Sequence, residues 1–131
     1  METVLEKPVF IKINEIKPAV HCYNVYCTVI SAKHSENTNF NGKTMKIVEG
    51  VVADETSCAN YKFIGNHTEQ MKVGKVIAIR NGKSSVVDEH ILLELDQFGR
   101  VTEENGVSFR SVNRDKNISD AKWEKQIRNV N

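Results

Sequence analysis

The residues best suited to metal binding or nucleophilic chemistry are three cysteines and four histidines. His21 and Cys22 are adjacent, but a structural zinc site needs paired ligands at close spacing, and neither Cys27 nor Cys58 completes a Cys-x-x-Cys pair. The other histidines lie in unrelated segments, at His34, His67 and His90. No spacing joins a nucleophile to a base and an orienting carboxylate. The sequence therefore predicts no metal site, no cofactor and no enzyme.

Side chains that could hold a nucleic-acid strand form a second group, because lysine and arginine contact phosphates and aromatic rings stack on bases. The chain has 18 Lys and Arg against 17 Asp and Glu, a net charge of +1. A dedicated nucleic-acid binder is usually more basic, so the positive charges must cluster to be effective. The candidate nucleic-acid-binding residues are Phe40, Lys43, Lys46, Lys62, Arg80 and Lys83.

The single tryptophan, Trp123, lies in the segment "ISDAKWEKQIRNV" (118–130). Ser119 is a favourable N-cap residue and apolar residues recur at helical spacing after it, so we predict a helix over about 119–130. Two roles stay open for this helix. It packs back on the rest of the domain, or Trp123, Ile127 and Val130 anchor a protein partner, as apolar residues at this spacing do in a helix that lies in a groove.

Short β-prone runs and turn-forming residues organise the rest of the chain. The runs predict strands at 23–33, 43–54, 58–65, 75–80 and 90–95. The segments between them predict a polar loop at 34–42, a single helical turn at 66–74, an Asn-Gly turn at 81–89 and a further turn at 96–100.

This order of elements is that of the oligonucleotide- and oligosaccharide-binding barrel, the OB-fold. We therefore expect an all-β protein, a five-stranded Greek-key barrel with a short helix between strands three and four and a C-terminal helix. Residues 1–101 are assigned to this domain, with strands from about 23, and residues 102–131 to a tail. Gly50, inside the second strand, predicts a bulge or sharp coil where the barrel closes.

The stretch "VVADETSCANYKFIG" (51–65) predicts a hairpin that turns at "DETS". On its second strand Tyr61 and Phe63 alternate with Lys62, so the two rings should face the core. The sequence does not decide between core and surface for Tyr23 and Tyr26.

Four short motifs carry a family resemblance: "IKP" before the first strand, "ADETS" at the hairpin, "MKVGKVIAIRNG" entering the fourth strand and "DQFGR" after the fifth. Over about residues 9–101 the chain resembles the replication-protein-A-like single-stranded-DNA-binding proteins, including the B subunit of the sensor-of-single-stranded-DNA complex. The short plant OB-fold proteins of that group are the most similar. The resemblance implies an open sheet face whose aromatic rings stack on bases beside a basic groove.

This chain departs from that pattern where the family carries its rings. Ile64 stands at one such position, Lys83 and Val87 at others in the run "KSSVVDE", and Glu94 at a fourth. Asp88 and Glu89 add negative charge in the same region. Lost stacking together with carboxylates near a phosphate path predicts weak, salt-sensitive contact with nucleic acid.

We therefore expect a non-catalytic OB-fold subunit of a nucleic-acid-acting complex (replication, repair, telomere or DNA modification) that scaffolds protein partners, with at most auxiliary nucleic-acid contact. The alternative is a stand-alone single-stranded DNA- or RNA-binding protein. No apolar run suits a membrane helix and no signal peptide is visible. An odd number of cysteines favours a reducing compartment, nuclear or cytoplasmic.

Overall fold

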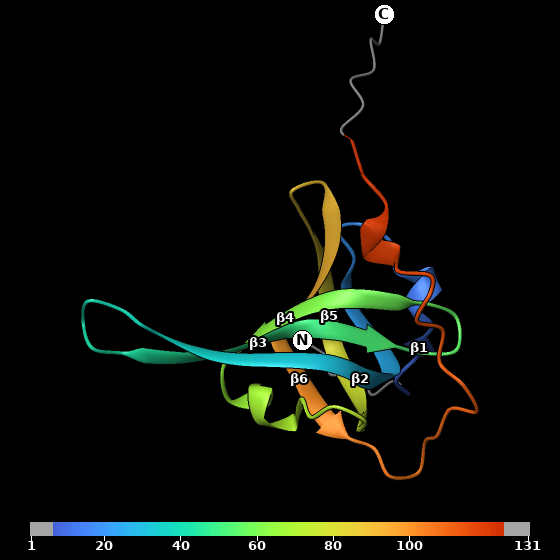
Figure 1. The fold of residues 1–131 in the computed structure, drawn as a ribbon, viewed down its shortest axis with the longest axis horizontal. Coiled ribbons are helices and arrows are strands. Elements are labelled where there is room, and N and C mark those ends of the chain that lie inside the picture. The colour runs from blue at the N-terminus through green and yellow to red at the C-terminus, as the bar shows by residue number, and fades with distance from the viewer. Residues whose placement is uncertain (1–6, 125–131) are drawn as a thin grey trace, which may run out of the picture.

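The computed structural model describes residues 7–124, which form a closed β-barrel with short 3₁₀ turns (Figure 1). The strand order is β1-β2-β3-β4-β6-β5, and β5 pairs again with β2, which closes the barrel and confirms the predicted OB-fold. None of the helices in this part of the chain is long and apolar enough to cross a membrane. In chain order the elements are β1 (Phe10–Ile11), η1 (Ile13–Glu15), β2 (His21–Thr38), β3 (Thr44–Ala53), β4 (Cys58–Ile64), η2 (Asn66–Gln70), β5 (Val76–Val87), β6 (His90–Glu103) and η3 (Ile118–Asp120).

Alternation along the strands fills the barrel, because successive strand side chains point to opposite faces. On β4, Tyr61 and Phe63 are buried and Lys62 points outward, which confirms the prediction for this strand. Tyr23 on β2 is also buried, whereas Tyr26 is only partly covered. The expected helical turn between the third and fourth barrel strands is present as the 3₁₀ helix η2.

The long β2–β3 hairpin is the largest departure from the predicted elements. Residues 34–42 were expected to be a loop, but the ladder continues outward to the pair Thr38–Thr44, forming the arm that projects from the barrel in Figure 1. The hydroxyls of these two threonines lie 2.9 Å apart, and the Asn39 side chain accepts hydrogen bonds from the backbone N–H groups of Asn41 and Lys43. The polar residues thus close a tight turn at the end of two paired strands.

The β5–β6 hairpin turns at a different place from the predicted Asn-Gly turn. Asn81 and Gly82 lie inside β5 at a β-bulge, and the chain reverses at Asp88–Glu89, with φ angles of 50° and 74° between the paired residues Val87 and His90. Gly82 is needed for close packing, because a Cβ atom there would lie 2.7 Å from the Tyr23 ring. The predicted turn at 96–100 is likewise an irregularity inside β6, which continues to Glu103.

Gly50 allows β2 and β3 to approach each other where the barrel bends. A Cβ atom at this position would lie 2.1 Å from the carbonyl oxygen of Ser31 on β2. The extra residue of the bulge is on the facing strand, between Val29 and Ser31, and not at Gly50 itself. The prediction therefore found the site of the bend but placed the bulge on the wrong strand.

The predicted C-terminal helix does not begin at Ser119. The structure has the short 3₁₀ helix η3 at Ile118–Asp120, and residues 121–124 are not helical. Ser119 is buried, and its hydroxyl accepts a hydrogen bond from the Asn60 backbone N–H at 2.9 Å, so it does not cap a helix of its own. Residues 125–131, including Ile127 and Val130, lie outside the described residues.

Candidate nucleic-acid and partner-binding surfaces

Part of the outer surface of the barrel strands carries a row of charges that alternate in sign; we call this row, with the outward positions of β3 and β4 beside it, the front face. Lys33 pairs with Glu49 across β2 and β3, and Glu49 pairs with Lys62 across β3 and β4. Glu94 pairs with Lys83 across β6 and β5. Because β4 and β6 run parallel with Tyr61 beside Leu93, the next residues on each, Lys62 and Glu94, are neighbours on the outer side. The complete row is Lys33, Glu49, Lys62, Glu94 and Lys83.

This alternation gives the front face little net attraction for a polyanion. A phosphate beside any lysine of the row would also lie near a carboxylate on an adjacent strand, and the two effects oppose each other. The row therefore lacks the unbroken basic track that a nucleic-acid groove needs.

The front face also lacks stacking rings. Among the described residues, the outward positions of β3 and β4 flanking the charged row hold Ile47 opposite Ile64 and Val51 opposite Asn60. The rings of β4 face inward, with the centroids of Tyr61 and Phe63 5.0 Å apart. Burial raises the pKa of Tyr61, and its hydroxyl donates a 2.8 Å hydrogen bond to the Ser31 carbonyl. These rings hold the barrel together and cannot reach a base.

The β2–β3 arm carries three of the predicted nucleic-acid residues. Phe40, at its tip, is 98% exposed, and Lys43 lies beside it on the surface. Lys46 points to the other side of the arm, where its ammonium group lies 3.1 Å from a carboxylate oxygen of Glu69 on η2. A depression of about 610 Å³ separates the arm from η2, and His34 bridges it by a 3.0 Å contact with the Met71 carbonyl. Lys46 therefore braces the arm, while Phe40 and Lys43 are available at its end.

Arg80 lies away from the front face. Its guanidinium carbon is 5.2 Å from the centroid of the Phe10 ring, and Nη2 lies 3.3 Å from a carboxylate oxygen of Glu104. Phe10 in turn stacks on Tyr26, with the ring centroids 3.9 Å apart and the planes 2° from parallel. The structure thus brings Lys62 and Lys83 into one row but separates Arg80 from both. The Phe10–Tyr26 stack was missed by the sequence reasoning, because β1 was not predicted.

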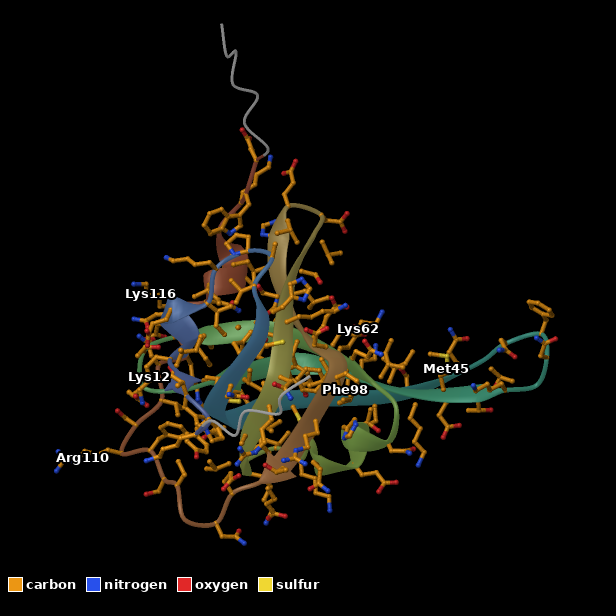
Figure 2. The ribbon with its side chains drawn as sticks, turned by 180° about the vertical axis from the view of Figure 1, so that it is seen from behind. Lys12, Met45, Lys62, Phe98, Arg110 and Lys116 are labelled. Atoms are coloured by element: carbon orange, nitrogen blue, oxygen red, sulfur yellow. The ribbon has the colours of Figure 1, made fainter. Side chains whose placement is uncertain are left out.

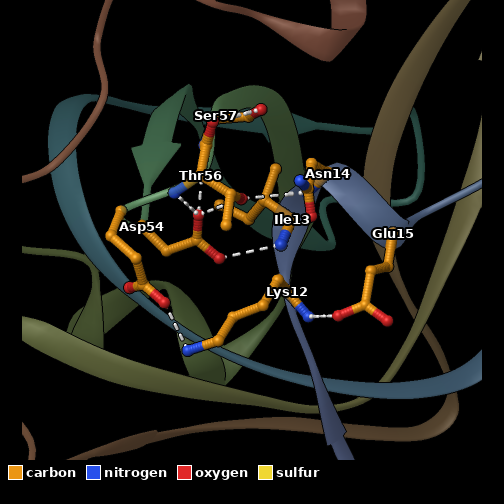
Figure 3. Close-up of polar contacts among 8 residues, drawn as sticks. Lys12, Ile13, Asn14, Glu15, Asp54, Thr56 and Ser57 are labelled. Atoms are coloured by element: carbon orange, nitrogen blue, oxygen red, sulfur yellow. Dashed lines mark hydrogen bonds and ion pairs between the residues drawn. The ribbon is translucent and has the colours of Figure 1, made fainter.

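The "DETS" turn fastens two segments that lie outside the long barrel strands, and Figure 3 shows its contacts with the first of them, residues 12–15. Asp54 is fully buried, and Oδ2 accepts a 2.8 Å hydrogen bond from the Ile13 backbone N–H. Oδ1 accepts from the Thr56 N–H, the Thr56 hydroxyl and the Ser57 N–H. The Asp54 carbonyl accepts from the Asn113 N–H at 2.8 Å. This motif therefore has a structural role, since it holds η1 and the loop after β6 against the barrel.

The tail after residue 116 lies between β4 and the β5–β6 hairpin. Beyond the bond from Asn60 to Ser119, the Ser119 carbonyl lies 2.7 Å from Nδ1 of His90, and the Trp123 N–H donates to the Glu89 carbonyl at 2.7 Å. The Trp123 side chain stays 41% exposed, beside a turn at which Val86 and Val87 are also exposed. The tail is docked on the barrel through its backbone, whereas its largest apolar side chain is only half covered.

The cysteines form no metal or nucleophile site among the described residues. Cys27 and Cys58 are buried, and burial raises the pKa of both thiols. Cys22 is exposed, and its Sγ lies 3.6 Å from the Asp96 carboxylate, which also contacts His21 at 3.2 Å. Desolvation and that carboxylate raise the pKa of Cys22, which disfavours a reactive thiolate. Over residues 7–124, no group of three or more His, Cys, Asp or Glu side chains is placed to hold a metal ion.

Comparison with known proteins gives a consistent family assignment. Residues 16–103 match the family described as single-stranded DNA binding protein Ssb-like, OB fold. An uncharacterised protein of Arabidopsis thaliana is 26% identical over 93% of this chain and 86% of its own length.

Solved structures agree on the fold. The solution structure of a hypothetical protein from Arabidopsis thaliana superposes with a TM-score of 0.76 at 25% identity, over 99% of this chain and 96% of that one. The second OB-fold domain of replication protein A from Methanococcus maripaludis gives a TM-score of 0.60 at 14% identity, over 76% of this chain and 99% of that domain.

Proposed function

We propose that this chain, which belongs to the Ssb-like family of OB-fold single-stranded DNA-binding proteins, is a non-catalytic subunit of a nucleic-acid-acting complex. Its main role in that complex is to hold a protein partner. The complex would act in replication, repair, telomere maintenance or DNA modification, in the nucleus or the cytoplasm. The observation that carries this proposal is the front face, whose central row alternates in charge and whose flanking outward positions on β3 and β4 hold no ring.

The physical argument rests on what a single strand gains from such a surface. Each base that stacks on an aromatic side chain contributes about 1–3 kcal/mol, and a basic groove adds a salt-dependent attraction to the phosphates. Both contributions are weak where lysines and glutamates alternate. A protein surface with complementary charges, in contrast, can pair with such a row, which favours specificity for one partner.

The partner contact is proposed at the tip of the β5–β6 hairpin. Trp123, Val86 and Val87 are each between 41% and 47% exposed there, and tryptophan is enriched among residues that dominate binding energy. Ile127 and Val130 follow Trp123 in the sequence and would extend this apolar contact.

Affinity purification of the tagged full-length chain, followed by mass spectrometry, identifies the partner. Trp123→Ala should then reduce co-purification of that partner strongly, while Phe98→Ala, which removes an exposed ring elsewhere, should leave it unchanged. Circular dichroism of both variants controls for folding. A partner that is retained equally by the wild type and by folded Trp123→Ala would contradict a docking role for this residue.

A stand-alone single-strand binder is the second candidate, and the tip of the arm favours it. Phe40 is almost fully exposed next to Lys43, which offers one ring and one charge to a strand. Lys62 and Lys83 would add contacts from the front face, whereas Lys46 and Arg80 are engaged by Glu69 and Glu104.

Fluorescence anisotropy with labelled single strands separates the two functions. The scaffold proposal predicts binding weaker than about micromolar at an ionic strength of about 0.15 M. Tight binding that survives added salt and is lost in Phe40→Ala would favour the stand-alone binder.

A further inference from the structure

The two terminal segments, 7–17 and 107–116, lie together on one side of the barrel; with Tyr26 between them we call this region the flank. Figure 2 shows Lys12, Arg110 and Lys116 on this side and Lys62 and Met45 on another. The segments are joined through the "DETS" turn, where Asp54 binds the backbone of Ile13 and Asn113. This contact makes the flank a fixed part of the fold, although the two segments are almost a hundred residues apart.

Positive charge is concentrated on the flank. Its two segments contain six Lys and Arg against two Asp and Glu, whereas residues 18–106 contain nine Lys and Arg against eleven Asp and Glu. All six basic side chains are exposed. Over residues 7–124, Lys12 is the only one of the six in an ion pair, with Glu55. The net charge of the chain is therefore close to zero because a basic flank is combined with a slightly acidic barrel.

Aromatic side chains lie within this basic region. A depression of about 350 Å³ is lined by Tyr26, Lys12 and Glu55 and by the loop residues Val107–Ser111, which include Phe109 and Arg110. Phe10 already covers one face of the Tyr26 ring, so a planar group can stack only on the other. Rings with unpaired cationic side chains beside them are the pattern that binds single-stranded nucleic acid without sequence preference.

We propose that the flank, and not the front face, is where this protein contacts single-stranded nucleic acid, with a base against Tyr26 or Phe109 and the phosphates along Arg110 and the neighbouring lysines. This inference rests on the auxiliary nucleic-acid contact in the proposed function and specifies its surface. It explains why the rings and the free charges are absent together from one side of the barrel and present together on another.

The test measures binding of the full chain to a fluorescein-labelled oligo-dT of about 20 nucleotides, longer than the roughly 4–16 nucleotides an OB fold covers. Arg110→Glu and Lys33→Glu form a matched pair, because each reverses one exposed positive charge, the first on the flank and the second on the front face. At low salt, Arg110→Glu should weaken binding about tenfold and Lys33→Glu less than about threefold. Phe109→Ser should weaken it about fivefold, and Phe40→Ser should have little effect.

Three results would overturn the inference: equal losses in Arg110→Glu and Lys33→Glu, losses confined to Lys33→Glu and Phe40→Ser, or no binding of oligo-dT by the wild type at low salt. Competition by polyglutamate as effective as that by unlabelled oligo-dT would also overturn it, because the flank would then recognise acidic chains in general. None of these results affects the partner test with Trp123→Ala, so failure of this inference is distinguishable from failure of the proposed function.

Discussion

The front face and the flank are built from different parts of the chain and differ in the chemistry they present. The front face consists of long strands whose paired register alternates lysine with glutamate. The flank consists of two segments held by Asp54, one through its carboxylate and the other through its backbone carbonyl. They carry six basic residues against two acidic ones, beside aromatic rings. A barrel can thus keep its architecture while the surface suited to a polyanion lies on segments added to its side.

Gly50→Ala tests the close approach of β2 and β3 and should have the largest effect on the free energy of unfolding. Its Cβ would lie 2.1 Å from a backbone oxygen, so β2 and β3 must separate, at a cost of about 3 kcal/mol. Urea unfolding measures this loss. Gly106→Ala is the matched control, since nothing lies within 4 Å of a Cβ at that position. Similar stabilities for the two variants would contradict the close approach at Gly50.

Asp54→Ala removes the carboxylate that holds the Ile13 backbone and the "DETS" turn, but leaves the Asp54 carbonyl that binds Asn113. Four donors bond to its side-chain oxygens, and leaving buried donors without partners should cost about 3 kcal/mol. Hydrogen exchange should speed up more at η1 and in the "DETS" turn than along the rest of β3 and β4. Asp115→Ala, at an exposed position, should change the free energy of unfolding by less than about 0.5 kcal/mol. Uniform loss of protection throughout the barrel would show that the carboxylate does not act locally on η1 and the turn.

Replacing both glutamates of the charged row would convert the front face into a basic track. Glu49→Lys with Glu94→Lys should raise the affinity for oligo-dT about tenfold and steepen its salt dependence, because five lysines then follow one another across the strands. The control is Glu36→Lys with Glu103→Lys, which makes the same change in net charge outside the row. Equal gains in both double variants would show that net charge, and not its arrangement, limits binding.

The ion pair between Lys12 and Glu55 at the edge of the flank should give the smallest effect. The hydrogen bond to Lys12 lowers the pKa of Glu55, so the contribution of this carboxylate to stability is present above its unfolded-state pKa and is lost as the pH falls through the lowered value. Both side chains are largely exposed, so the contribution should stay below about 0.5 kcal/mol. Comparison of wild type with Glu55→Gln by urea unfolding between about pH 7 and pH 3 measures it, and an equal pH dependence in both would exclude the contribution.

Local patterns in the sequence predicted the features that depend on neighbouring residues. The alternation of Tyr61, Lys62 and Phe63 identified which side chains enter the core, and the order of β-prone runs identified the barrel. The same reasoning failed where a local signal competed with a distant contact. Asn81-Gly82 is typical of a turn, yet Gly82 is required inside β5 because Tyr23 packs against it. Ser119 is typical of a helix cap, yet its hydroxyl accepts a hydrogen bond from the Asn60 backbone on β4.

The sequence by itself determined the class of fold and the inward rings of β4, because strand periodicity and residue type are local properties. Only the tertiary structure decided that lysines and glutamates alternate across five strands, that Asp54 joins Ile13 to Asn113, and that Tyr26 borders the same depression as Arg110. These three features depend on strand register and on contacts between segments far apart in the chain. Closure of the barrel fixes both, and no short stretch of sequence specifies them.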